Sequence, residues 1–302
     1  MLEKIKTKLD RDINCDLNIE ELKLLYFMDN DEYENLDYYH KNRNNYKDFC
    51  KIFGKDFVAQ SIDEINENTI AYVGNLKIDY PLPTYNLKYI YGNLDYRLDK
   101  VYNLENLEVI YSDAYFPKLE KAEGLENLRI VGSIRCDNLK NSEGLESLLY
   151  IGDDCYFESL VGAEGLESLQ YIGGGAYFNS LISSKGLKNL KKILWCANFP
   201  SLVSADDLKS LQYIHKSAYF HSLKSAQCLE KLEYIGKNAI FRSLKSAKGL
   251  ENLEYIGGYA DFYSLESVDG LENINIKGDI LASPEIEKIL SKKDEKSNYN
   301  RK

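Results

Sequence analysis

The chain has 302 residues, of which 44% are hydrophobic, so it can form a buried core in one large domain or two ordinary ones. It carries 48 Asp and Glu residues against 38 Lys and Arg residues. The resulting net charge of -10 argues against nucleic acid or an anionic membrane as the main partner. The first residues are too charged for a signal peptide, and no later run approaches the roughly 18 apolar residues of a membrane span. We therefore expect a cytoplasmic protein.

Cysteine use agrees with that expectation. The cysteines are scattered and form no CxxC pair, so the sequence offers neither a zinc knuckle nor a dithiol redox motif. We expect free thiols in a reducing compartment. The six residues are Cys15, Cys50, Cys136, Cys155, Cys196 and Cys228.

Residues 1–69 are predicted to form a small helical N-terminal cap or subdomain. Two segments, NIEELKLLYFM and SIDEIN, begin with an N-capping residue that is followed three residues later by Glu, the spacing of a capping box. A further helix is expected near residues 46–53. The two capping pairs are Asn18 with Glu21 and Ser61 with Glu64.

A unit of 21 residues then recurs through residues 70–282 and decides the fold. We number its positions from Gly249 as position 1. Leu occupies positions 2, 5 and 17, Ile position 8, a small residue position 12 and an aromatic residue position 14. Two degenerate copies, IAYVGNLKIDYPL and LKYIYGNLDYRL, come first. The matching units begin at Asn103, Gly124, Gly144, Gly165, Gly186, Asp207, Cys228, Gly249 and Gly270.

Such regularly placed aliphatic residues cannot be buried within one unit, but they can stack on equivalent residues of the next. Alternation in a short strand places positions 12 and 14 inside and position 13 outside. Glycine pairs at positions 9 and 10, as in Gly173-Gly174 and Gly257-Gly258, predict corners with positive φ. We predict a mostly β protein, a right-handed β-solenoid of about ten coils whose strands pair about 4.8 Å apart.

The unit has the motif GLxxLxxIGG, followed by a short strand and then by SLxSxxGL. In this motif it resembles the repeats of leucine-rich-repeat proteins, especially those of receptor L domains. The resemblance covers about two thirds of the chain and implies a binding scaffold without specifying a ligand. The usual Asn ladder is absent, and the unit is shorter than in typical L domains. We expect inward serines at position 16 to form the internal ladder instead: Ser159, Ser180, Ser201, Ser222, Ser243 and Ser264.

Residues 283–302 are expected to close the array. Pro284 follows Ser283 and occupies a first helical position, which predicts a short capping helix over the last coil. The tail SKKDEKSNYNRK lacks apolar periodicity and is predicted to be disordered.

No catalytic constellation emerges from the sequence. Of the three histidines, His215 and His221 fall at outward or corner positions, and His40 lies in the N-terminal segment. We explain the recurrence of Glu at position 3 by the exposure of that position. The glycines at 173–175 are not followed by the helix that a phosphate loop requires. We therefore expect no enzyme activity, no cofactor and no metal site.

Tyrosines at outward positions are the strongest indication of a binding surface. Stacking of the coils turns positions 7 and 13 into columns of rings, and Tyr is favoured at interfaces. The alternative is purely structural, because Tyr also stabilises exposed strands. The columns contain Tyr150, Tyr171, Tyr213, Tyr234 and Tyr255 at position 7, and Tyr115, Tyr156, Tyr177 and Tyr219 at position 13.

One unit, residues 186–206, breaks the pattern. It has Lys192 at position 7, Asn198 at position 13 and the only Trp, Trp195, at the corner. We expect His215 on the next coil to lie beside Trp195, and Tyr177 and Tyr219 to flank Asn198. Trp and Tyr are enriched at binding hot spots, although a drifted repeat would look the same.

These observations predict a non-enzymatic scaffold that binds a partner protein through the Tyr-lined face of the solenoid. The residues expected to bind are Trp195, Tyr177, Tyr219, His215, Tyr171, Tyr213 and Tyr234. Two alternatives stay open. One is a surface or receptor-like carbohydrate-binding module, and the other is enzyme activity in the N-terminal segment. Sequence leaves the oligomeric state open.

Overall fold

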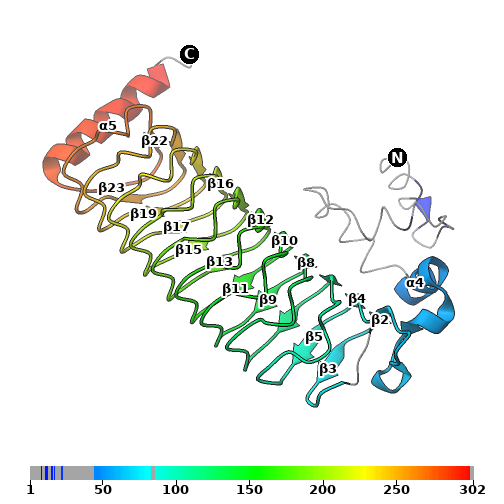
Figure 1. The fold of residues 1–302 in the computed structure, drawn as a ribbon. Coiled ribbons are helices and arrows are strands. Elements are labelled where there is room, and N and C mark those ends of the chain that lie inside the picture. Colours follow the sequence, from blue (N-terminus) through cyan, green and yellow to red (C-terminus); the bar gives the residue numbers. More distant parts are fainter. Residues whose placement is uncertain are drawn as a thin grey trace.

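The computed structural model describes residues 44–82 and 86–299, together with Lys8, Arg11, Asp12, Cys15, Leu17 and Leu22; for residues 292–299 only the backbone is described. The chain winds into a β-solenoid (Figure 1). Two parallel sheets, of 12 and 11 strands, run along it, and within each sheet the strands of one coil pair with those of the next.

Each regular coil contributes one very short strand to each sheet. Positions 7 and 8 form the first strand and positions 12 and 13 the second. The 12-stranded sheet contains β1 (Val58–Ala59), β2 (Ala71–Val73), β4 (Tyr89–Tyr91), β6 (Val109–Ile110), β8 (Ile130–Val131), β10 (Tyr150–Ile151), β12 (Tyr171–Ile172), β14 (Lys192–Ile193), β16 (Tyr213–Ile214), β18 (Tyr234–Ile235), β20 (Tyr255–Ile256) and β22 (Asn275–Ile276). The 11-stranded sheet contains β3 (Leu76–Ile78), β5 (Leu94–Tyr96), β7 (Ala114–Tyr115), β9 (Ile134–Arg135), β11 (Cys155–Tyr156), β13 (Ala176–Tyr177), β15 (Ala197–Asn198), β17 (Ala218–Tyr219), β19 (Ala239–Ile240), β21 (Ala260–Asp261) and β23 (Ile280–Leu281).

The interior is one continuous core, as the period predicts. In regular coils the residues at positions 2, 5, 8, 12, 14 and 17 are buried. The position-14 rings form an internal column: Phe199 stacks on Phe178 and Phe220, with centroids 5.1 and 5.5 Å apart. Stacking between coils therefore supplies the burial that a single coil cannot.

Glycines take positive φ at position 1, not at the predicted pairs. Gly165 has φ +107°, and a Cβ there would lie 2.1 Å from the carbonyl oxygen of Ser142. Gly173 does not have positive φ, yet its Cβ would lie 2.0 Å from the carbonyl oxygen of Gly152. The prediction of positive φ at positions 9 and 10 was therefore wrong. Glycine is needed there for another reason, since the backbone of the neighbouring coil lies too close for a Cβ atom.

The Glu at position 3 has a role beyond exposure. Its carboxylate accepts a hydrogen bond from the backbone N–H of the position-1 glycine of the same coil, as between Gly165 and Glu167 at 3.0 Å. The coil with Lys188 at position 3 lacks this acceptor. There the Gly186 N–H donates to the carboxylate of Asp207 on the following coil, also at 3.0 Å. The same bond recurs in the coils that carry Glu126, Glu146, Glu251 and Glu272.

The serines at position 16 are half-buried and do not form the predicted internal ladder. Among them, the Ser201 hydroxyl donates a hydrogen bond to the carbonyl of Asn179 on the preceding coil, at 2.7 Å. Polar side chains at position 11 instead link several pairs of successive coils, through hydrogen bonds that are exposed or partly buried. Each accepts the backbone N–H of position 11 on the next coil: Asn93 donates to Asn75, Asp113 to Asn93, Gly175 to Asp154, Asn238 to Ser217 and Tyr259 to Asn238.

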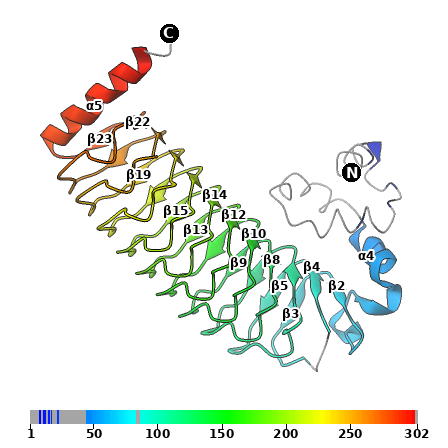
Figure 2. The ribbon, with the colours of Figure 1, turned by 45° about the horizontal axis from the view of Figure 1, so that its top comes forward.

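Helices lie near both ends of the solenoid (Figure 2). The helix α4 (Asn45–Phe53) forms where a helix near 46–53 was predicted, and Phe49 packs on Tyr91 of β4. The SIDEIN segment forms only a 3-10 turn, η3 (Ile62–Glu64), and the Ser61 side chain makes no capping bond. A second 3-10 turn, η2 (Lys55–Phe57), follows α4. The predicted Asn18 capping pair lies outside the described residues.

The C-terminal helix α5 (Pro284–Tyr299) begins at the predicted proline. Its Ile286 and Leu290 are buried in the continuous core, so it covers the last coil. The helix is longer than expected and includes most of the tail predicted to be disordered.

Candidate functional site

Trp195 occupies the corner between β14 and β15, and its side chain is 51% exposed. Its backbone is tied into the stack, since the N–H of Lys216 donates to its carbonyl at 3.1 Å. The Lys216 ammonium lies 5.1 Å from the centre of the indole ring. Such a cation–π contact contributes about 0.5–1 kcal/mol at an exposed position. The fold thus holds a large apolar ring, with a cation over it, at the surface.

Beside this corner, three tyrosines form a column on the outer face of the 12-stranded sheet. Tyr213 and Tyr234 stack with ring centroids 5.3 Å apart, and Tyr234 and Tyr255 with centroids 5.0 Å apart. Tyr213 is 39% exposed, and Tyr234 is half-buried. Lys192 takes the place of Tyr on the preceding coil, so the column begins next to the Trp195 coil.

The same position is buried on earlier coils. Tyr171, expected to bind, is only 5% exposed and stacks on Tyr150 with centroids 4.6 Å apart. Both belong to a small hydrophobic cluster outside the main core, and Leu194 packs against it. Tyr171 is therefore not part of an accessible surface. An outward position in a coil therefore does not guarantee exposure.

The position-13 residues lie on the outer face of the other sheet. Asn198 pairs with Tyr177 on one side and Tyr219 on the other, as its place in the repeat predicts. The Asn198 amide donates to Asn179 at 2.7 Å. Both tyrosines are half-buried, and burial raises the pKa of Tyr177. The two rings are separated by a small polar residue and form no continuous column.

We define the Trp195 surface as the outward side chains at positions 7 to 10 of three consecutive coils. His215 is exposed and lies in the bend that directly follows β16. At positions 7 to 11 these coils read KILWC, YIHKS and YIGKN and contain no acidic residue; the coil before them, YIGGG, has none either, and YIGDD, two coils before, contains two. The members of the surface are Lys192, Trp195, Tyr213, His215, Lys216, Tyr234 and Lys237.

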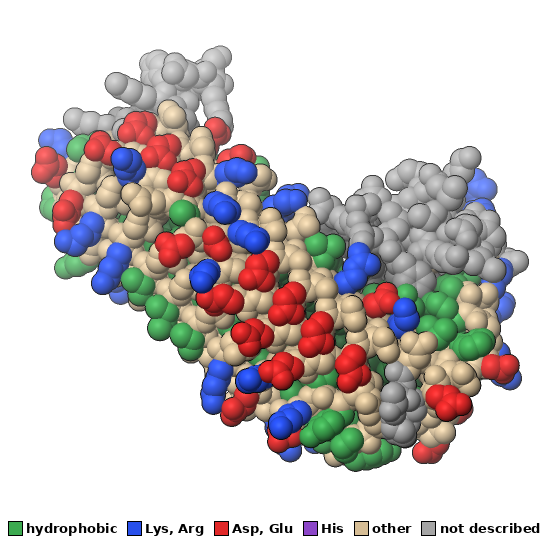
Figure 3. Space-filling model, viewed as in Figure 1, with side chains coloured by type: hydrophobic (Ala, Val, Ile, Leu, Met, Phe, Trp, Pro, Cys, Tyr) green, Lys and Arg blue, Asp and Glu red, His purple; other side chains and the backbone are tan. Residues whose placement is uncertain are grey.

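This composition contrasts with another side of the solenoid. Figure 3 shows Asp and Glu side chains in rows along the coils. The contrast follows from the repeat, because each position becomes a row once the coils stack. The sequence therefore places lysines and aromatic rings together on an otherwise acidic protein.

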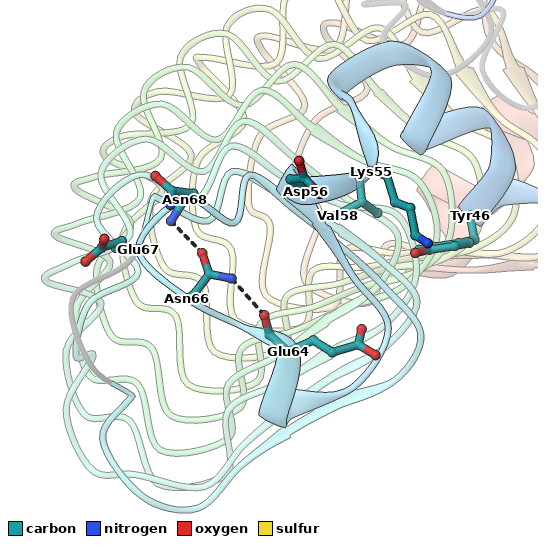
Figure 4. A pocket seen from close by; sticks show the side chains of 8 residues that line it. All are labelled: Tyr46, Lys55, Asp56, Val58, Glu64, Asn66, Glu67 and Asn68. Atoms are coloured by element: carbon teal, nitrogen blue, oxygen red, sulfur yellow. Dashed lines mark hydrogen bonds between the residues drawn. The ribbon is translucent and has the colours of Figure 1, made fainter.

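A second candidate is an open depression of about 550 Å³ near the N-terminal end (Figure 4). Its lining is mostly polar, and the Asn66 amide donates to the Glu64 carbonyl at 3.1 Å. His40, which motivated the enzyme alternative, lies outside the described residues. Within the described part of the chain, no group of His, Cys, Asp and Glu side chains could hold a metal ion. The lining residues are Tyr46, Lys55, Asp56, Val58, Glu64, Asn66, Glu67 and Asn68.

All six cysteines are free thiols, as expected. Cys136 and Cys155 are fully buried, and desolvation raises the pKa of each thiol well above its ordinary value. They fill core positions that other coils give to Phe and Ala.

No protein-family model matches the sequence, and no curated protein matches it significantly. None of the helices in the described residues is long and apolar enough to cross a membrane.

Proposed function

We propose that this protein is a non-enzymatic scaffold that binds a partner protein through the Trp195 surface. The observation that carries the proposal is a half-exposed Trp with Lys216 over its ring, next to the stacked pair Tyr213 and Tyr234. Rings held rigidly by a stacked backbone lose little conformational entropy on binding, which favours them as anchors.

The architecture supports the same proposal. Repeat solenoids present extended surfaces to their partners, and the resemblance to leucine-rich repeats implies such a scaffold. A cytoplasmic location is consistent with the free thiols, since disulfides are rare in reducing compartments. The carbohydrate alternative would also use exposed rings, but lysines beside them are not required for stacking on sugars.

Affinity capture from native cells, followed by measurement of Kd with the identified partner, tests the proposal. The variant Trp195→Ala, Tyr213→Ala, Tyr234→Ala should lose binding, since a hot-spot ring contributes about 2 kcal/mol or more. A control variant removes three rings that are exposed elsewhere, Tyr102→Ala, Tyr115→Ala, Tyr263→Ala, and should bind as the wild type does. Unchanged Kd for the first variant, with its fold intact, would refute the proposal.

A further inference from the structure

We infer that the ligand of the Trp195 surface is an acidic peptide segment that carries an apolar or aromatic residue. The inference rests on the proposed function and specifies its partner. Two consecutive coils place Lys216 and Lys237 at position 10 of this surface, in the same row as Trp195 on the coil before them. The chain as a whole has a net charge of -10, so this local excess of cations runs against its overall charge.

The geometry of the stack sets the spacing of these cations. The backbone N–H of Lys237 donates to the carbonyl of Lys216 at 3.0 Å, and the N–H of Lys216 donates to Trp195 at 3.1 Å. Position 10 therefore repeats along the axis at the interval between parallel strands, about 4.8 Å. An extended peptide rises about 3.3 Å per residue, so a segment of about four residues spans the three coils.

The rings supply the second part of the recognition. Tyr213 is 39% exposed and Trp195 51% exposed, and together they offer apolar area that a purely electrostatic site would not need. Contact with these rings would add hydrophobic burial to charge pairing. Because exposed ion pairs alone are weak, the rings should provide affinity while the lysines select acidic sequences.

An acidic peptide is favoured over nucleic acid, although both are anionic. The net charge of -10 of the chain would repel a long phosphate backbone that extends beyond the lysines. A short acidic segment fits within three coils and avoids that repulsion.

Trp195 is the only Trp, so its fluorescence reports on this surface alone. We would titrate the full chain with three probes that lack Trp: a peptide of alternating Glu and Phe, its counterpart with Lys in place of Glu, and oligodeoxythymidine. The acidic peptide should shift the emission, and its affinity should fall as salt screens the charges. The other two probes should have no effect. A response to the Lys peptide or to the oligonucleotide, or no response to the acidic peptide, would overturn the inference.

A pair of matched charge reversals completes the test. Lys216→Glu with Lys237→Glu should weaken binding of the acidic peptide about tenfold or more, because two favourable pairs become repulsive. Lys188→Glu with Lys231→Glu changes the net charge equally, at exposed sites outside the surface on the first and third of the three coils, and should leave affinity unchanged. Equal affinity of both variants would contradict the inference.

The two proposals can fail separately. A captured partner that binds the Lys216→Glu, Lys237→Glu variant as tightly as wild type, but not the variant without the three rings, would overturn the acidic ligand and leave the scaffold function standing. Loss of binding in both variants supports both proposals.

Discussion

The internal Phe column offers the sharpest test of how the coils are held together. Phe199 is fully buried and stacks on rings in both neighbouring coils, with centroids 5.1 and 5.5 Å apart. Phe157 is buried equally but contacts a ring on one side only, Phe178 at 5.5 Å, because the coil before it has Cys136 at this position. The two sites therefore differ by one ring pair and in pair geometry, since the Phe157–Phe178 pair is edge-on at 72° and both Phe199 pairs are stacked.

Replacement by Leu keeps most of the apolar volume and removes the ring contacts. An aromatic pair contributes about 0.5–1.5 kcal/mol beyond the area it buries. Phe199→Leu should therefore lower the free energy of unfolding by about 0.5–1.5 kcal/mol more than Phe157→Leu does. Urea denaturation followed by circular dichroism measures both variants. Equal losses would refute the contribution of ring stacking, and burial alone would then explain the column.

The stacked coils lead to three further predictions. Gly165→Ala should lower the free energy of unfolding by at least about 1–2 kcal/mol in urea denaturation, because its φ is +107° and its Cβ would meet a backbone carbonyl. In the control Gly162→Ala the Cβ meets only a flexible Glu side chain, so the free energy of unfolding should barely change. The native Cys155 thiol should resist a thiol reagent that labels half-buried Cys228, because burial raises its pKa and blocks access; equal labelling rates would contradict its placement. Unfolding free energy should fall as pH rises from about 10 to about 12, because the pKa of Tyr96 is raised to about 12 in the fold and is about 10 in the unfolded chain. A Tyr96 phenol that ionises near pH 10 in the native protein, by ultraviolet absorbance, would contradict this.

The recurring aliphatic and aromatic positions were sufficient to predict the solenoid. A residue that recurs every 21 positions faces its own copy in the next coil, so recurring apolar residues such as Leu187, Ile193 and Phe199 can be buried by stacking. The helix near 46–53 and the start of α5 at Pro284 were also predictable, because local capping and periodicity specify them.

What sequence reasoning missed depends on distances between coils. The sequence shows a polar residue such as Asn238 at position 11. Only the alignment of one coil on the next shows that its side chain accepts a hydrogen bond from the backbone N–H of the following coil. The role of Glu167 as a hydrogen-bond acceptor likewise cannot be predicted without knowing where the backbone N–H of Gly165 points. Tyr171 is buried in a cluster outside the main core, which a pattern of inward and outward positions does not predict.

The central claim is that the Trp195 surface contacts a partner protein. A photo-crosslinking amino acid placed at residue 195 in native cells tests it directly, with the same substitution at Tyr263, which is 66% exposed, as the control. We predict a discrete adduct from position 195 that the acidic peptide suppresses, and none from position 263. Identical adducts from both positions, or none from position 195, would contradict the claim.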